Sequence, residues 1–231
     1  MFGLKKRNCH HTQSKMKCKW LTNHTSIDST GRVRPCCTWR NTGNEPLVTE
    51  NLDDYRNSNF VKNVQQQLEK NIWPEGCEDC RLDEDYGKSS MRTKSFSDYK
   101  ILYENSKDYM INPGRDAEIK FGNLCNLKCA MCSPYNSTLI AKEYDEMLSN
   151  GIDHELIKRK TPNVNAWYED DKILSSVAKQ MNDMALIRFS GGEPTVNSYL
   201  ADFLKQIDNK RVHIQITCLL YTSDAADDAS S

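Results

Sequence analysis

The second half of the chain alternates between short apolar runs and amphipathic stretches, and this alternation constrains its fold more than any other feature. Three runs are predicted to be strands, namely 117–123, 185–192 and 212–217. Three stretches are predicted to be helices, namely 137–151, 171–183 and 198–209. A strand–helix–strand order predicts parallel strands joined by right-handed crossovers. In such sheets the chemistry lies at the carboxyl ends of the strands.

The first half of the chain carries weaker signals for regular structure. Residues 18–39 are expected to form a short hairpin with its turn at 28–31, where the sequence is Asp-Ser-Thr-Gly. Residues 52–74 are expected to form one helix, because Tyr55, Val61 and Leu68 belong to an approximate apolar stripe and Pro74 stops it.

Composition excludes several classes of protein. The net charge is −1, from 31 basic and 32 acidic residues, so no global field attracts nucleic acid or a membrane surface. The sequence has no signal-peptide pattern and no apolar run near the roughly 20 residues of a membrane helix. We therefore expect a cytoplasmic protein, whose thiols stay reduced. Ten cysteines, several of them closely spaced, then indicate metal binding rather than disulfides.

Three of these cysteines directly follow the first predicted strand. Cys125, Cys129 and Cys132 have the spacing C-x3-C-x2-C. Structural zinc sites typically use four ligands, whereas iron–sulfur clusters use one thiolate per iron. Three thiolates on a four-iron cluster leave one iron open to another ligand. The triplet therefore favours a cluster with a vacant position.

A second motif, Ser-Gly-Gly-Glu-Pro at 190–194, follows the next predicted strand. Its two glycines allow a ligand to approach the backbone closely. Glu193 offers a carboxylate to a ligand ammonium group, and Pro194 makes the turn rigid. Because both motifs end strands of one predicted sheet, we expect them to lie at the same edge.

The segments "CNLKCAMC" and "SGGEP" together resemble the radical S-adenosylmethionine (SAM) superfamily, including the methionine before the last cysteine. The resemblance implies a [4Fe–4S] cluster with SAM on its open iron. One electron then cleaves SAM to a 5′-deoxyadenosyl radical, which abstracts hydrogen from a substrate. The implied cluster ligands and catalytic residues are Cys125, Cys129 and Cys132. The implied SAM-binding residues are Ser190, Gly191, Gly192, Glu193 and Pro194. The alternative for the triplet is a zinc knuckle completed by another residue.

The amino-terminal cysteines form a second set with a different spacing. The pattern C-x12-G-x4-C runs from Cys18 through Gly31 to Cys36, and a CxxC pair follows much later. This pattern resembles the opening of SPASM and twitch domains, which hold auxiliary [4Fe–4S] clusters in radical SAM enzymes. Its position before the barrel resembles twitch domain-containing radical SAM proteins of phages and metagenomes. The implied ligands of the auxiliary cluster are Cys18, Cys36, Cys77 and Cys80.

Two assignments in this set stay open. Cys37 is an alternative to Cys36, because adjacent residues of a strand face opposite ways. A structural zinc ribbon at the same four positions is an alternative to the cluster. Cys9 is expected to be a spare thiol. The histidines do not lie at the sequence intervals from the cysteines that are typical of metal ligands. They are His10, His11, His24, His154 and His213.

The expected fold is α/β: a truncated partial (β/α) barrel of the radical SAM type, preceded in the chain by a small cysteine-rich α+β domain. The expected parts are an arm at 1–17, a twitch- or SPASM-like auxiliary-cluster domain at 18–95, a connector at 96–116, the first half of the radical SAM core at 117–217 and a tail at 218–231. The tail resembles one reading frame of a common transposase sequencing adapter. It is therefore predicted to be non-native, which leaves Cys218 without a ligand role.

The expected function is that of a radical SAM enzyme, impaired in the printed chain because later barrel strands are missing. The expected partners are a reductant such as flavodoxin or ferredoxin and a peptide or protein substrate, since auxiliary-cluster relatives often modify peptides. The sequence carries no membrane or nucleic-acid signal. The competing hypothesis is a non-catalytic zinc- or iron–sulfur-binding structural module.

Overall fold

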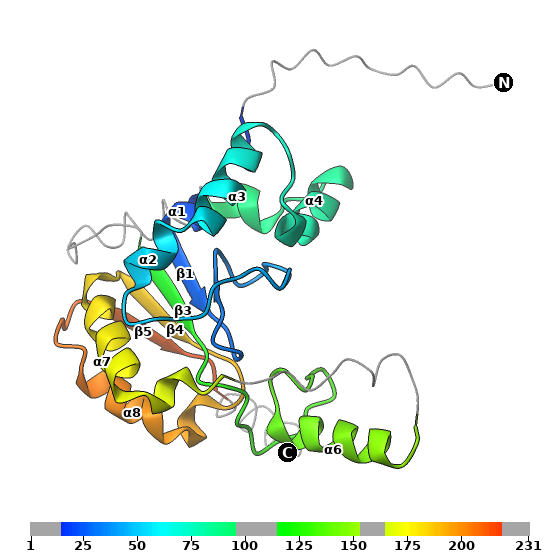
Figure 1. The fold of residues 1–231 in the computed structure, drawn as a ribbon, viewed down its shortest axis with the longest axis vertical. Helices are drawn as coiled ribbons and strands as arrows, with labels where there is room; N and C mark the ends of the chain where they lie inside the picture. Colours follow the sequence, from blue (N-terminus) through cyan, green and yellow to red (C-terminus); the bar gives the residue numbers. More distant parts are fainter. Residues whose placement is uncertain (1–14, 96–114, 153–164, 219–231) are drawn as a thin grey trace, which may run out of the picture.

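A five-stranded sheet forms the centre of the protein in the computed structural model, which describes residues 15–95, 115–152 and 165–218 (Figure 1). The strands are β1 (His24–Ile27), β2 (Val33–Arg34), β3 (Asp116–Ile119), β4 (Leu186–Phe189) and β5 (His213–Ile216). Their order in the sheet is β2-β1-β3-β4-β5. β1, β3, β4 and β5 are parallel, and β2 is antiparallel to β1. The prediction of an α/β fold with parallel strands is confirmed.

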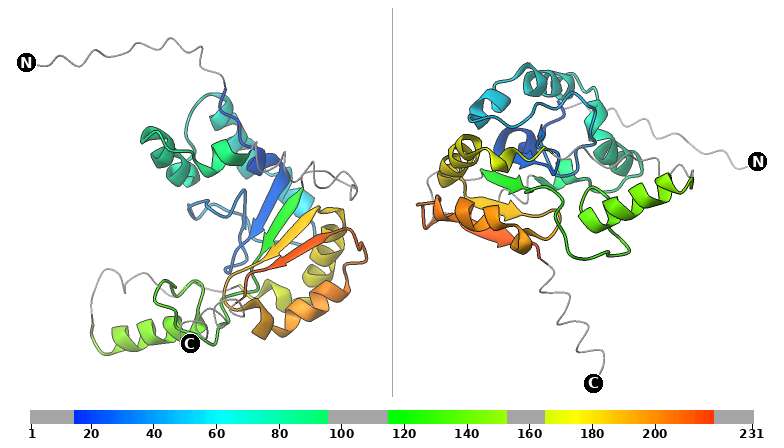
Figure 2. Two further views of the ribbon diagram at one scale, coloured as in Figure 1. Left: turned by 180° about the vertical axis from the view of Figure 1, so that it is seen from behind. Right: turned by 60° about the horizontal axis from the view of Figure 1, so that its bottom comes forward.

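One face of the sheet is apolar and is covered by two helices, α7 (Asp171–Gln180) and α8 (Ser198–Lys205), as both views of Figure 2 show. Because side chains alternate along a strand, Ile119 and Phe189 point to this face, and neither has any exposed surface. Phe203 of α8 is equally buried and packs edge-on against Phe189, with 5.7 Å between ring centroids. Full burial of each such side chain stabilises the fold by about 1.5–3 kcal/mol.

Residues of the opposite face are polar, and several of them, such as His24, Ser26 and Asp116, are also buried. In one row, Ser26 of β1 lies opposite Glu118 of β3, which lies opposite Arg188 of β4. In the row nearer the amino ends of the strands, Nδ1 of His24 is 2.9 Å from a carboxylate oxygen of Asp116. The second carboxylate oxygen of Asp116 accepts a hydrogen bond from Arg188.

The helices begin at residues that cap them. Ser137 accepts a hydrogen bond at the start of α6 (Thr138–Ser149), and Asp170 and Asn197 do so for α7 and α8. The other labelled α-helices are α1 (Lys19–Asn23), α2 (Leu52–Arg56), α3 (Asn59–Glu69) and α4 (Glu78–Asp85). Four short 3-10 helices are labelled η1 (Glu75–Cys77), η2 (Trp167–Glu169), η3 (Met181–Asp183) and η4 (Pro194–Val196). Residues 91–95 are also helical.

The single helix predicted over 52–74 is wrong, because the chain forms two helices there. Ser58 interrupts the run: its backbone is extended, and its hydroxyl accepts a hydrogen bond from the Val61 N–H at 3.3 Å. The second helix also ends earlier than predicted, at Glu69. Asn71 then takes a φ of 57°, in the left-handed region that ends helices, three residues before Pro74.

A hairpin is present within 18–39, since β1 and β2 are antiparallel and joined by a turn, but it is shorter than predicted. Residues 19–23 form α1 instead of a strand, and Cys36 and Cys37 lie beyond the end of β2. A carboxylate oxygen of Asp28 accepts hydrogen bonds from the backbone of Thr30 and of Arg32, and Gly31 has a φ of 73°. However, β1 also pairs in parallel with β3, which lies 92 residues further along the chain. The sheet is therefore continuous across the division expected at 96.

No helix of the described ranges has the length and apolar character needed to cross a membrane. The arm at 1–14, most of the connector at 96–114 and the tail at 219–231 lie outside the described residues, as do Cys9, His10, His11 and His154.

Candidate functional site

The cysteine triplet lies on the loop that leaves the carboxyl end of β3. Cys125 is buried, whereas Cys129 and Cys132 are half-buried. The Cys132 N–H donates to the carbonyl of Cys129 at 2.9 Å, which forms a tight turn between these two residues. Burial raises the pKa of the Cys132 thiol, and the neighbouring thiols of Cys129 and Cys125 raise it further. The loop thus gathers the three thiols at one point.

Hydrogen bonds to the start of α6 fix this loop at several positions. The Thr138 N–H donates to the carbonyl of Asn123 at 2.9 Å, and its hydroxyl donates to the carbonyl of Cys125 at 3.2 Å. The Ser137 hydroxyl donates to the carbonyl of Leu127 at 2.8 Å. Met131, the residue before the last cysteine, points outward and is 95% exposed. The loop is therefore anchored on one side and open to solvent on the other.

The Gly-Gly turn after β4 packs directly against the cysteine loop. The Glu193 N–H donates to the carbonyl of Leu124 at 2.7 Å. Gly191 and Gly192 have φ values of 81° and 26°, and a Cβ atom on Gly192 would lie only 2.2 Å from the Leu124 oxygen. Only glycine permits this approach without a shift of the backbone. The two motifs expected at one edge of the sheet therefore meet through backbone contacts.

The side chains of the second motif are engaged within the protein. Glu193 is 4% exposed, and one of its carboxylate oxygens accepts a hydrogen bond from the Thr195 N–H at 3.1 Å. The Ser190 hydroxyl donates to the carboxylate of Glu118 at 2.5 Å. Pro194 is buried and begins η4. Glu193 thus caps a short helix, a role that the sequence analysis missed, because Glu is not one of the residues that typically cap helices.

The second set of cysteines comes together from three segments of the chain. Cys18 precedes α1, Cys36 follows β2, Cys77 caps α4, and Cys80 lies in the first turn of α4. All four line one small cavity of about 20 Å³, which is partly open to solvent. The other residues of the wall are Trp20, Thr38, Gly76, Met91 and Arg92. We call this the four-cysteine cavity.

Burial and mutual proximity control the protonation of these thiols. Burial raises the pKa of Cys36 to about 12. Burial also raises the pKa of Cys77, and the thiols of Cys36, Cys18 and Cys80 raise it further. The Arg92 guanidinium lowers the pKa of Cys77 and of Cys18. Without a metal, Cys18, Cys36 and Cys77 are therefore neutral thiols, and metal binding at them must release protons.

Cys37 faces away from this cavity, although it is the neighbour of Cys36. Burial raises the pKa of its thiol, and the carboxylate of Glu118 raises it further, whereas Lys120 and Arg188 lower it. Cys37 therefore lies near the polar face of the sheet. Of the two alternatives that the sequence left open, Cys36 is the residue on the cavity wall.

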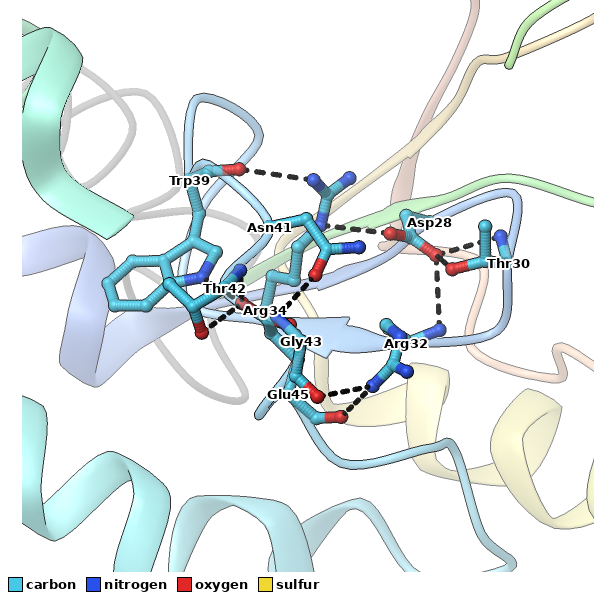
Figure 3. A network of polar contacts seen from close by, with 9 residues as sticks. All are labelled: Asp28, Thr30, Arg32, Arg34, Trp39, Asn41, Thr42, Gly43 and Glu45. Atoms are coloured by element: carbon cyan, nitrogen blue, oxygen red, sulfur yellow. Dashed lines mark hydrogen bonds and ion pairs between the residues drawn. The ribbon is translucent and has the colours of Figure 1, made fainter. Parts of the chain in front are cut away.

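A network of polar contacts fixes the loop that carries Cys36 (Figure 3). Asp28 lies 3.3 Å from Nε of Arg34, whose Nη1 donates to the carbonyl of Trp39 at 3.1 Å. The Trp39 indole in turn donates to the buried carboxylate of Glu45 at 2.7 Å. Its ring lies against Gly76, where a Cβ atom would be 2.1 Å from the ring. Trp39 thereby joins the Cys36 loop to the turn before Cys77.

The described residues contain no group of three or more His, Cys, Asp or Glu side chains that meets the geometry of a site for one metal ion. His24 and His213 lie on strands of the sheet, and neither lines the four-cysteine cavity. Sequence reasoning missed Trp39 as a residue near this cavity, since it has no periodic or motif signal. Arg92 ends the segment 76–92 that resembles the auxiliary-cluster pattern, but its place on the cavity wall was not predicted. Comparisons of the chain with models of protein families, with curated proteins and with solved structures find no match.

Proposed function

We propose that the chain binds a [4Fe–4S] cluster at Cys125, Cys129 and Cys132 and binds SAM at the open iron, as in radical SAM enzymes. The observation that carries the proposal is the contact between the Gly-Gly turn and the cysteine loop, with Glu193 N–H on the Leu124 carbonyl at 2.7 Å. Two motifs from different strands are joined there, at the carboxyl edge of a parallel sheet. This is the edge where α/β proteins bind their ligands.

The donor set fits the proposed group. Three thiols leave one position of a four-iron cluster for an outside ligand, and the loop is open to solvent beside Met131. When bound, a reduced cluster of this kind supplies one electron for cleavage of SAM to a 5′-deoxyadenosyl radical. The chain holds the thiols by the hydrogen bonds of Ser137 and Thr138. The glycine backbone at 191–192 packs against the Leu124 carbonyl and the Lys120 side chain, which keeps the second motif beside the cysteine loop.

We infer further that the parallel sheet belongs to a partial (β/α) barrel, and that the four-cysteine cavity holds an auxiliary [4Fe–4S] cluster. Four thiols lining a cavity suit a cluster in which each iron takes one thiolate. A structural zinc ribbon at the same four thiols is the alternative. The proposed partners are a low-potential reductant and a peptide or protein substrate.

Anaerobic reconstitution with iron and sulfide tests both assignments. About eight iron atoms per chain are expected, four for each [4Fe–4S] cluster. After reduction, addition of SAM is expected to change the electron paramagnetic resonance signal of the wild type and to leave that of Cys129→Ala unchanged. Release of 5′-deoxyadenosine is the accompanying activity. Two results would refute the assignment as a radical SAM enzyme and favour a structural metal-binding module. One is a protein that takes up zinc alone, and the other is an electron paramagnetic resonance signal that SAM does not change.

A further inference from the structure

A groove of about 460 Å³, partly open to solvent, lies between α3 and the segment that leads into α1. Lys15, Lys17 and Lys19 line it and are exposed, while Met16 and Cys18 between them are half-buried. The three lysines are therefore the solvent-exposed residues of this segment. Leu68 and Glu69 of α3 contribute an apolar part and one carboxylate to the wall. We call this feature the lysine groove.

The backbone of the lysine groove is held in place on both sides. The Met16 N–H donates to the side chain of Asn71 at 2.8 Å, and Arg92 donates to the carbonyl of Lys17 at 2.9 Å. The Lys19 N–H donates to the hydroxyl of Ser95 at 3.3 Å. Within the described part of the chain, none of the three lysines forms an ion pair. The groove thus carries three lysines against one glutamate, on a held backbone, in a chain whose net charge is −1.

Cys18 lines both the lysine groove and the four-cysteine cavity. Arg92 connects the same two features, because it lies on the cavity wall and holds the carbonyl of Lys17. Anything bound in the groove is therefore adjacent to a residue that we propose as a metal ligand. Positive charge beside a redox centre favours an acidic electron-transfer partner over other anions, because such partners dock by charge complementarity.

We propose that the lysine groove is the docking surface for an acidic one-electron carrier protein that reduces the centre held by the four cysteines. One electron passes from the carrier, which is oxidised, to this centre, which is reduced, and no bond is made or broken. The inference rests on the proposed function, since it requires a redox-active cluster in the four-cysteine cavity. It adds the place where electrons enter the protein.

An acidic [2Fe–2S] ferredoxin serves as the probe of this surface. The test variant is Lys15→Glu/Lys17→Glu/Lys19→Glu. The control is Lys142→Glu/Lys172→Glu/Lys179→Glu, which changes the net charge equally at exposed lysines of α6 and α7. At low salt the test variant is expected to bind the probe at least 10-fold more weakly, while the control changes Kd less than 3-fold. The difference is expected to shrink as salt screens the charges.

The second readout is the rate of electron transfer from the reduced probe to the protein, measured by stopped flow. The reduced probe is mixed with anaerobically reconstituted protein of known iron content. The test variant is expected to oxidise the probe at least 10-fold more slowly than the wild type while holding the same amount of iron.

The outcomes separate the two proposals. Equal losses in the test and control variants, or no binding of the probe by the wild type, would overturn the docking surface. The docking surface would also be overturned if the test variant bound a DNA oligonucleotide more weakly than the wild type but bound ferredoxin equally well. A protein that loads only zinc at the four cysteines refutes the redox centre itself. A protein that loads iron there but binds ferredoxin equally after charge reversal refutes only the docking surface.

Discussion

The two sets of cysteines lie at opposite ends of the parallel strands and are built differently. The four-cysteine cavity lies near the amino end of β1, and its thiols come from three segments held together by buried aromatic residues such as Trp20 and Trp39. The triplet lies beyond the carboxyl end of β3 on one loop, which is fixed by backbone hydrogen bonds and open to solvent. Four enclosed donors suit a structural or electron-transfer centre. Three donors on an open loop suit a centre that also binds a ligand.

This comparison predicts that the two sites hold metal independently but contribute differently to stability. We expect Cys77→Ala/Cys80→Ala to remove about half of the iron and to lower Tm by about 10 °C, because a metal that joins several segments adds to the folding free energy. We expect Cys129→Ala/Cys132→Ala to remove the other half with little change in Tm. Iron analysis and calorimetry check this, and equal Tm losses would contradict it.

The contact between the Gly-Gly turn and the cysteine loop predicts the next largest effect. Gly192→Ala places a methyl group against the Leu124 carbonyl and is expected to cost about 2–4 kcal/mol in the free energy of unfolding. It is also expected to reduce iron at the triplet and not at the four-cysteine cavity.

Gly43→Ala is the matched control, because Gly43 has a φ of 83° but a Cβ atom added there would have no neighbouring atom within 4 Å. Only backbone strain of about 1 kcal/mol is expected there. If the two variants lose equal stability in chemical denaturation, the close approach at Gly192 has no energetic role.

The adjacent pair Cys36 and Cys37 offers a sharper test within one site. Cys36→Ser is expected to weaken metal binding in the four-cysteine cavity, since its thiol is on the wall. Cys37→Ser is expected to leave the iron content unchanged, since its side chain lies near the polar face of the sheet. Iron loss in Cys37→Ser alone would reverse the assignment.

The smallest expected effect is a pH dependence of the metal-free protein. Burial raises the pKa of Cys36 to about 12, above the value of the unfolded chain. The folded state therefore retains this proton where the unfolded state loses it, so stability is complete below about pH 9 and declines from there toward pH 12. Tm measured from pH 8 to 11 is expected to fall. A flat profile would show that Cys36 is not buried as a neutral thiol.

Local patterns predicted much of this molecule. Asp28 and Gly31 determined the hairpin turn, the apolar runs at 185–192 and 212–217 contained strands, and the two motifs did come to one edge. The division of the predicted helix at Ser58 was missed, since one capping hydroxyl there outweighs a continuous apolar stripe.

Features that depend on distant residues were not predictable from the sequence. The choice between Cys36 and Cys37 required the position of Glu118 on another strand. The pairing of β1 with β3 joins residues 92 positions apart, and no local signal encodes it. Trp39 acquires its role only because the fold brings Gly76 against its ring.

The pairing of β1 with β3 also limits how this protein can be rearranged. A cysteine-rich segment that ended before β3 would expose the hydrogen-bonding edge of β1 and the side chain of Ile27, which is 1% exposed in the intact sheet. The segment is therefore not a cassette that can be transplanted onto another protein. A segment that carries the four cysteines must therefore also include β3 if this edge of β1 is to stay paired.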